Sequence, residues 1–283
     1  MGHSCWWPGK YRVVEAIVLA WEKRGRNYRD GLRSVCFERF PEVINGLLDD
    51  WQQTALHFFL NQHLFKKKAK LLDVGCGWGR MVKPLLTQYP GWTFIGIDPA
   101  RSMVALYNQT VKEKGRAVVG LLPNLPFPKE SFDCVLVITT LMYLLDQKER
   151  QAAVCEIDRL LIPGGVCIII ENNRLGHQII TGFGLSRLLA GNGAPAGTGG
   201  YMFDRSEIDN LFAQTSLSLQ SKIGMPVITL VLPLLVIMAK VLPTSITALV
   251  GELVNSLDHA LWRITFCSLY ISYLYVKKQP AKI

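Results

Sequence analysis

The amino-acid sequence predicts an α/β protein with a doubly wound, mostly parallel seven-stranded sheet, a helical N-terminal extension and an apolar helical insertion before the last strand. Two observations carry the prediction. From Lys70 onward, short apolar runs alternate with helical stretches, which is the pattern of parallel strand–helix–strand units. The first run, Leu71–Val74, leads into a loop with glycine at every second position, at Gly75, Gly77 and Gly79. Such a loop is typical of a ligand site at the carboxyl end of a parallel sheet.

Each further element follows from the local sequence. Residues 11–64 are predicted to be helical, because apolar side chains recur at helical spacing over 11–22 and 43–64. Asp204, with Glu207 three residues later, predicts a helix start. Pro163 and Gly164 predict a sharp turn before the fifth strand. The expected strands are 70–75, 92–98, 117–121, 132–138, 165–171, 217–223 and 268–277, and the expected core helices include 80–89, 100–114, 147–160 and 174–189.

These elements divide the chain into a helical extension at 1–65, a core at 66–223, an apolar insertion at 224–264, and the last strand with its tail at 265–283. A hydrophobic content of 49% over 283 residues provides for a substantial core. The net charge of +9 suggests attraction to an anionic partner, either a membrane surface or a nucleic acid. Seven cysteines without a C-x-x-C pair indicate reduced thiols in a cytoplasmic protein, and no metal site is predicted.

The second predicted strand ends in Asp98, and this carboxylate defines the kind of ligand. A carboxylate at such a position can accept hydrogen bonds from both hydroxyls of a ribose. Asp98 and the glycine loop therefore predict a pocket for a nucleoside cofactor. A dinucleotide-binding loop needs the spacing Gly-x-Gly-x-x-Gly, and Arg80 stands where its third glycine is required. A nicotinamide-dependent oxidoreductase is therefore a less favoured alternative.

The segment Asp73–Gly79 resembles motif I of the class I S-adenosylmethionine-dependent methyltransferases. Leu125–Val135 and Glu156–Gly165 are similar to two further blocks of that superfamily, and they occur in the expected order. The resemblance is closest to the small-molecule methyltransferases of the ubiquinone and menaquinone biosynthesis type. It implies a Rossmann-like methyltransferase fold, with Asp73 near the amino group of the cofactor's methionine moiety. It also implies that S-adenosyl-L-methionine is held by Asp73, Gly75, Cys76, Gly77, Gly79, Asp98, Pro99, Leu122 and Thr139.

Leu121 departs from the family pattern. Members often carry an aspartate at the corresponding point, before the Leu-Pro-Phe block, and this aspartate holds the amino group of adenine. Here backbone groups, apolar packing or Asn124 would take its place. The missing carboxylate keeps a second hypothesis open, namely a non-catalytic binding subunit with a methyltransferase fold.

The acceptor of the methyl group is predicted to be a hydrophobic small molecule or a lipid-linked compound, with O-methylation favoured over C- or N-methylation. Thr139–Tyr143 lacks the [DN]-P-P-[YF] motif with which amino-methyltransferases of nucleic acids bind a flipped base. No Pro-Cys nucleophile follows the fourth strand either, so no nucleic acid is expected as a partner. Tyr143, where relatives often have histidine, and His177, just beyond the fifth strand, are the candidate catalytic residues.

The apolar insertion is the most individual part of the sequence. Its first run, 226–240, is short and interrupted by Pro233, which argues against a transmembrane helix. In the second run, 246–264, apolar side chains fall on one helical face and polar side chains on the other. Three interpretations remain: a cap over the acceptor pocket, association of the protein with a membrane surface as a peripheral protein, or a dimer interface. The oligomeric state is not predicted. Trp6, Trp7, Tyr11 and the glycine-rich segment 182–200 would complete a lid.

Overall fold

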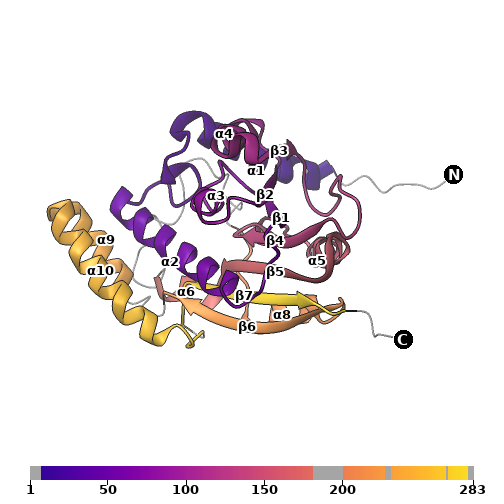
Figure 1. Cartoon of the computed structure of the whole chain (residues 1–283). Helices are drawn as coiled ribbons and strands as arrows, with labels where there is room; N and C mark the ends of the chain where they lie inside the picture. The colour runs from indigo at the N-terminus through magenta and orange to yellow at the C-terminus, as the bar shows by residue number, and fades with distance from the viewer. Residues whose placement is uncertain (1–7, 181–199, 227–230, 266, 280–283) are drawn as a thin grey trace.

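A seven-stranded sheet forms the centre of the protein in a computed structural model that describes residues 8–180, 200–226, 231–265 and 267–279 (Figure 1). The strand order is β3-β2-β1-β4-β5-β7-β6. β7 runs antiparallel to both of its neighbours, and the other pairs are parallel, which confirms the predicted fold class. The strands are β1 (Lys70–Val74), β2 (Thr93–Asp98), β3 (Gly115–Val119), β4 (Phe132–Ile138), β5 (Leu161–Asn172), β6 (Leu217–Met225) and β7 (Tyr270–Lys277).

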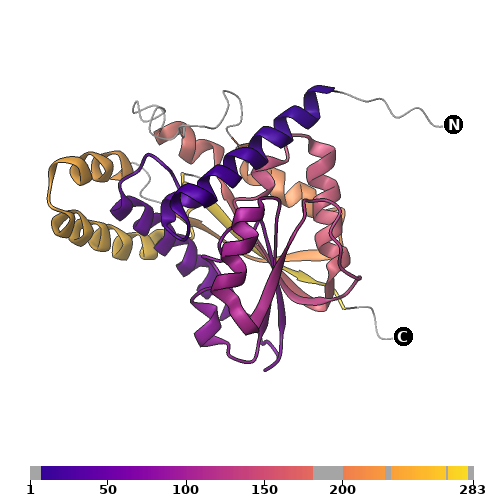
Figure 2. The ribbon, with the colours of Figure 1, turned by 90° about the horizontal axis from the view of Figure 1, so that it is seen from above.

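Helices cover both faces of this sheet. One face carries α2 (Glu42–Leu60), α3 (Leu85–Gln88), α4 (Arg101–Val111) and α9 (Leu232–Val241). The opposite face carries α5 (Gln147–Leu160) and α8 (Arg205–Phe212). α1 (Pro8–Tyr28) packs across α4, as Figure 2 shows. The described chain also contains α10 (Thr244–Leu261), α6 (Arg174–Ile180) and the short turns η1 (Leu32–Ser34), η2 (Lys112–Lys114) and η3 (Leu141–Tyr143).

Strand β4 shows why the sheet was recognisable from the sequence. Cys134 and Leu136 belong to the apolar cluster on the α2 side, while Val135 and Val137 belong to the cluster on the α5 side. All four side chains are fully buried. A parallel strand that is covered on both faces has a continuous apolar run instead of an alternating one. Because β1 and β2 are parallel to β4, their carboxyl ends meet at the same edge of the sheet.

The helix expected over 80–89 is reduced to the single turn α3. Pro84 has no backbone N–H, so it cannot bond the carbonyl of Arg80 as a helix requires. That carbonyl instead accepts a hydrogen bond of 3.1 Å from the Gln53 side chain on α2. Proline thus directs the segment after the glycine loop against α2.

Other predicted bounds shift by a few residues. β3 lies two residues earlier than expected, and the amide of Gly120 donates to the Asp98 carbonyl at 3.2 Å as the chain turns away. α4 ends at Val111, where Lys112 takes the left-handed backbone conformation at φ +50°. β5 begins at Leu161, earlier than predicted, with a register shift opposite Phe132 and Cys134.

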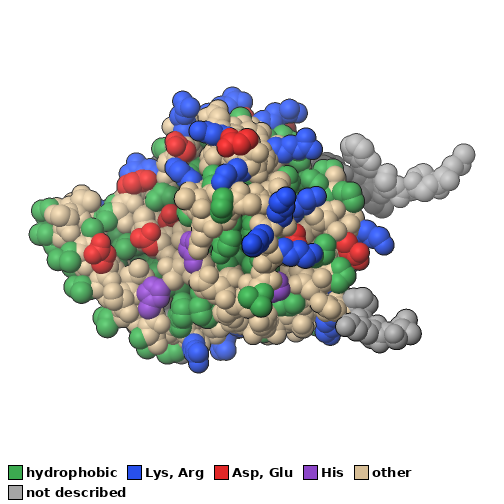
Figure 3. Space-filling view, viewed as in Figure 1, with side chains coloured by type: hydrophobic (Ala, Val, Ile, Leu, Met, Phe, Trp, Pro, Cys, Tyr) green, Lys and Arg blue, Asp and Glu red, His purple; other side chains and the backbone are tan. Residues whose placement is uncertain are grey.

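Helix α10 does not turn its predicted apolar stripe toward the core. Its buried residues are Thr247, Gly251, Val254 and Asp258, of which only Val254 is a larger apolar side chain, and α10 packs against α2. A Cβ on Gly251 would lie 2.6 Å from Cδ1 of Leu47, so the two helices approach closely at this glycine. The predicted apolar stripe faces outward instead, and hydrophobic side chains gather at this end of the molecule (Figure 3). Its exposed members, with those of α9, are Leu234, Ile237, Val241, Ile246, Leu249, Leu253, Leu257 and Leu261.

Among the described helices, none combines the length and the apolar character needed to cross a membrane. We call the exposed apolar side chains of α9 and α10, from Leu234 to Leu261, the α9–α10 apolar face.

Candidate active site

A cavity lies at the carboxyl edge of the sheet, beneath helix α1. Its walls come from the loop after β1, the ends of β2 and β4, the segment 120–122, and one side of α1. Nine of the predicted site residues line it, namely Asp73, Gly75, Cys76, Gly77, Asp98, Pro99, Leu122, Thr139 and Tyr143. Gly79 and His177 are not part of the lining.

The glycine loop is held tightly by the protein itself. Gly75 and Gly77 have φ values of +70° and +51°, in the left-handed region that favours glycine. The amides of Gly75 and Cys76 donate to the carbonyl of Ile97 at 2.8 and 3.1 Å. A Cβ on Gly75 would overlap the side chain of Thr140. The need for glycine here therefore arises from backbone conformation and contact with the end of β4, in addition to any approach of a ligand.

Asp98 is fixed at the end of β2 by two backbone hydrogen bonds. One carboxylate oxygen accepts from the amide of Gly77 and the other from the amide of Ala100, each at 2.9 Å. Burial raises the pKa of Asp98 to about 6, although both amide bonds favour the charged form. Each oxygen has further lone-pair capacity, so the carboxylate can still accept hydrogen bonds from a ligand in the cavity.

Asp73 and Arg80 form a second polar part of the lining. The Oδ2 atom of Asp73 is buried without a hydrogen-bond partner, and burial raises the pKa of this carboxyl to about 7. Arg80 is bound from behind by α2, where its guanidinium donates to Asp49 and, at 2.6 Å, to Gln52. In the sequence, Arg80 indicates only that the loop does not have the dinucleotide spacing. Its position directly after the last glycine of the loop was the signal that could have marked it as a site residue.

The segment that lacks the family's aspartate provides an apolar surface. Gly120, Leu121 and Leu122 line the cavity, as does Pro99. Asn124 is exposed and is not in the lining. Asn124 is therefore a poor replacement for the missing carboxylate. Apolar packing is the better one, because Leu121 and Leu122 line the cavity.

Helix α1 supplies the apolar roof of the cavity through Val14, Ile17, Val18 and Trp21. The ring of Trp21 stands edge-on to Tyr143, with 5.6 Å between centroids and 87° between planes. Burial raises the pKa of the Tyr143 hydroxyl to about 12, so this group is a hydrogen-bond donor at neutral pH and does not act as a base. Trp6 and Trp7 lie outside the described residues, as does the glycine-rich segment up to residue 199, and the side chain of Tyr11 is also not described.

The turn after β4 is held by Glu171, which was not among the predicted site residues. One Glu171 oxygen accepts from the amides of Thr140 and Leu141 at 2.8 and 2.7 Å. Burial raises the pKa of Glu171 to about 8. Thr139, at the cavity wall, has a φ of +49°. Glu171 thus supports the turn that carries Thr139, Thr140 and Tyr143.

His177 is buried on α6, with its ring centroid 6.5 Å from that of Phe37. Burial lowers its pKa to about 4, so the imidazole is neutral at physiological pH. Since it does not line the cavity, we assign it no contact with a substrate. The described residues of 224–264 are likewise absent from the lining, because they pack on α2. The interpretation of the insertion as a cap over this cavity is therefore not supported.

Residues 72–169 match a protein family described as a methyltransferase domain. The tRNA N(3)-cytidine methyltransferase METTL2 of Gallus gallus is 29% identical over 211 residues, which cover 69% of this chain and 54% of the relative. A demethylmenaquinone methyltransferase of Thermus thermophilus is 28% identical over 138 residues, or 46% of this chain and 60% of the relative. The chain thus spans 54% and 60% of the length of these curated relatives.

Among solved structures, geranyl diphosphate C-methyltransferase from Streptomyces coelicolor, in complex with geranyl diphosphate and S-adenosyl-L-homocysteine, has a TM-score of 0.57. It is 17% identical, and the match covers 83% of this chain and 82% of that chain. Likeness at this identity concerns the fold, and it confirms the predicted class I architecture. Because a tRNA methyltransferase is among the relatives, the expectation that no nucleic acid takes part is not confirmed.

Proposed function

We propose that this chain, whose residues 72–169 match a methyltransferase domain, transfers the methyl group of S-adenosylmethionine to a hydrophobic small molecule or lipid-linked acceptor. One observation carries the choice of acceptor. The cavity joins a polar end, formed by Asp73, Asp98 and the glycine loop, to an apolar roof from α1. A polar cofactor and an apolar acceptor would meet where these two parts adjoin.

The residues at the polar end fit the cofactor. The Asp98 carboxylate can accept from ribose hydroxyls, and Leu121 and Leu122 offer apolar surface to an adenine ring. The unpartnered Oδ2 of Asp73 suits a cationic donor such as an ammonium group. The cofactor, when bound, supplies an electrophilic methyl group on a positively charged sulfur.

The protein's own contribution would be alignment and exclusion of water. Methyl transfer is a direct in-line displacement, so fixing the acceptor near the methyl group is the main requirement. Trp21 and Tyr143 pack edge to face in the wall, and Ile17 in the roof is buried. The described lining contains no histidine that could remove a proton. This favours an acceptor that is already nucleophilic, such as an acidic hydroxyl or a carboxylate, and hence O-methylation.

Calorimetry with S-adenosylhomocysteine tests the cofactor part of the proposal. Wild-type protein should bind this ligand, and Asp98→Ala should bind it at least tenfold more weakly. Asp98→Asn keeps one acceptor oxygen for the Gly77 or Ala100 amide and should lose less. Glu113→Gln, an exposed carboxylate outside the cavity, is the matched control. Absence of binding by wild type at millimolar ligand would overturn the proposal.

The acceptor is tested with S-adenosylmethionine that carries a labelled methyl group. Hydrophobic phenols, carboxylic acids and polyprenyl compounds in vesicles should accept label, whereas Tyr143→Ala should raise KM more than it lowers kcat. A wild type that binds S-adenosylhomocysteine but labels none of these acceptors would instead support a non-catalytic binding subunit.

The α9–α10 apolar face supports a location on a lipid surface. Leu249, Leu253 and Leu257 are each about 60% exposed and follow one side of α10. An exposed row of leucines is unfavourable in water, whereas a lipid interface would cover that face. Lys240 and Arg263 lie near the two ends of the pair of helices and could contact anionic head groups.

Co-sedimentation with vesicles of anionic phospholipid tests this location. The double variant Leu253→Asp and Leu257→Asp should release the protein into the supernatant, while Ser256→Asp, an exposed polar site on the same helix, should remain bound. Leu235 is fully buried and would be unsuitable for such a test. If wild type stays in the supernatant and the double variant changes the oligomeric state, the face is a contact between two copies.

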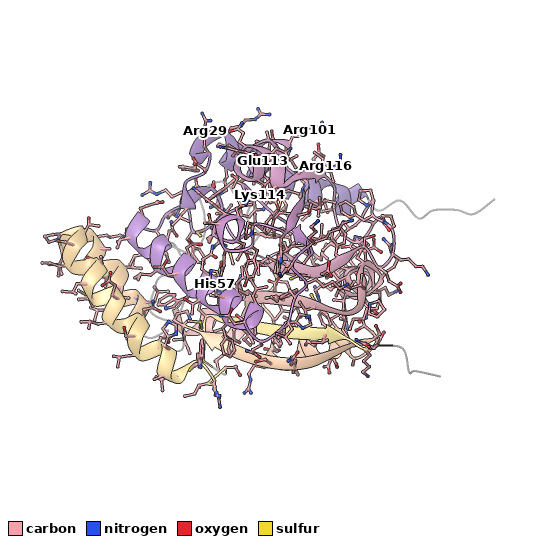
Figure 4. The ribbon with its side chains drawn as sticks, in the orientation of Figure 1. Arg29, His57, Arg101, Glu113, Lys114 and Arg116 are labelled. Atoms are coloured by element: carbon pink, nitrogen blue, oxygen red, sulfur yellow. The ribbon has the colours of Figure 1, made fainter. Side chains whose placement is uncertain are left out.

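A nucleic-acid acceptor is the second candidate, and two observations favour it: the tRNA-modifying relative and a basic surface. Figure 4 shows Arg29, Arg101, Lys114 and Arg116 on one side of the molecule, around α4 and the start of β3. Binding of tRNA that falls steeply with salt, and that weakens in Arg101→Gln with Arg116→Gln, would support it. Transfer of label to tRNA by wild type would decide in its favour.

A further inference from the structure

Arg24 places a positive charge behind the wall of the cavity, at the end that α1 covers. Its guanidinium carbon lies 4.6 Å from the centre of the Trp21 ring. One terminal nitrogen, Nη2, donates to the carbonyl of Arg33 at 2.5 Å and also to that of Cys36. Trp21 lines the cavity, and so does Val35, the residue before Cys36. The guanidinium thus contacts the ring of one lining residue and the backbone beside another.

The charge of Arg24 is not balanced by an ion pair. In the described part of the chain, no aspartate or glutamate pairs with it, and Glu38 acts on it only from a distance. The carboxylate of Glu38 accepts instead from the hydroxyl of Tyr28 at 2.7 Å. The Nε atom of Arg24 is buried without a hydrogen-bond partner. A guanidinium stays charged at neutral pH, so a half-buried one without a counter-ion exerts a positive potential on its surroundings.

Tyr143 is the lining residue on which this potential acts. The charge of Arg24 lowers the pKa of the Tyr143 hydroxyl, although burial raises it more. The charge of Glu171 would oppose Arg24, but burial raises the pKa of Glu171 to about 8, so this carboxyl is mostly protonated at neutral pH. Outside the polar end, the acidic side chain among the described lining residues is Glu149 on α5, which takes part in an interaction of its own. Arg24 therefore favours negative charge in the cavity next to Tyr143.

Given the proposed function, on which this step rests, the acceptor lies beside Tyr143 and within reach of this charge. We infer that the acceptor is bound as an anion, a carboxylate or an ionised phenol on an apolar body, and that Arg24 determines this preference. The apolar body would pack against Val14, Ile17 and Val18 of the roof. The Tyr143 hydroxyl could donate to the charged oxygen. Arg24 acts through the wall, so it is a specificity-determining residue and does not touch the reacting atoms.

Two probes of nearly the same shape isolate the effect of charge, namely 2-naphthoate and its neutral amide, 2-naphthamide. Calorimetry is carried out on protein saturated with S-adenosylhomocysteine. Wild type should bind the naphthoate about fivefold or more tightly than the amide. Arg24→Gln should weaken binding of the naphthoate about tenfold, because a unit charge acting through a half-buried wall contributes on the order of one pKa unit. Its affinity for the amide should change by less than about twofold.

Two further variants separate charge from packing. Arg24→Lys keeps the positive charge but not the planar group that stacks on Trp21, so it should keep most of the preference for the naphthoate. Lys23→Gln removes a charge from the exposed neighbouring residue and should leave both affinities unchanged. Unchanged affinity of each variant for S-adenosylhomocysteine shows that it is folded.

Equal losses for both probes in Arg24→Gln would overturn the inference, because Arg24 would then only support the wall. Equal affinities of wild type for the naphthoate and the amide would also overturn it, and this result needs no variant that must fold. A wild type that binds S-adenosylhomocysteine but neither probe refutes the inference and leaves the cofactor part of the proposed function standing. If wild type does not bind S-adenosylhomocysteine, the proposed function itself fails.

Discussion

Replacing Asp73 with asparagine should make the ligand-free protein less sensitive to alkaline pH. The carboxyl is 2% exposed, and burial raises its pKa from 3.8 to about 7. A raised pKa in the folded state means that the group favours folding while it is protonated. This contribution is full below pH 3.8 and is lost progressively as the pH rises to about 7, because ionisation then costs more in the folded than in the unfolded chain.

The magnitude follows from the size of the shift. At about 1.4 kcal/mol for each pKa unit, the change from 3.8 to about 7 corresponds to about 4 kcal/mol over the whole range. Between pH 5.5 and pH 8, linkage assigns about 2 kcal/mol of that loss to Asp73. An asparagine does not titrate, so the free energy of unfolding of Asp73→Asn minus that of wild type should rise by about 2 kcal/mol over this interval.

Urea unfolding at several pH values without ligand measures this difference. Asp98 and Glu171 also have raised pKa values, and they contribute to both proteins, so their contributions largely cancel. Glu113→Gln, at an exposed carboxylate, is the matched control and should follow wild type at every pH. If the difference between Asp73→Asn and wild type stays constant from pH 5.5 to 8, Asp73 is ionised throughout and the argument from burial is wrong.

Three further predictions concern the ligand, helix α10 and helix α1. S-adenosylhomocysteine should bind wild type about tenfold more tightly at pH 8 than at pH 6, because the ligand's ammonium group needs ionised Asp73; calorimetry that shows no pH dependence would contradict this. Gly251→Leu should lower the free energy of unfolding, measured in urea, by about 1–3 kcal/mol, because even a Cβ at this position would lie 2.6 Å from Cδ1 of Leu47. The control Leu253→Ser, at an exposed position, should change it by less than about 0.5 kcal/mol. Glu22 accepts a hydrogen bond from the amide of Ser102 at 2.9 Å and so links α1 to the start of α4. Glu22→Gln should therefore speed proteolysis within α1. Equal rates in Glu22→Gln and in the exposed control Glu15→Gln would contradict that role.

Much of the core was predictable because its signals are local. β4 is an unbroken apolar run since both of its faces are covered, and the alternating glycines of the loop have positive φ values that other residues rarely adopt. Asp98 could be assigned to the cavity because a residue at the end of a parallel strand has a fixed place at the sheet edge. The order of strands and helices follows from the same alternation of patterns.

The tertiary structure decided what depends on contacts between distant segments. Arg80 and Glu171 acquire their roles from partners 28 to 31 residues away, and no local pattern marks such pairs. His177 shows the reverse case, because a polar side chain near a strand end is turned into the core beside Phe37. For α10, hydrophobic periodicity predicted the helix and its apolar stripe, but the close approach of Gly251 to Leu47 decided that the stripe faces outward. Periodicity defines the two faces of a helix, and only the shape of the neighbouring surface decides which face it buries.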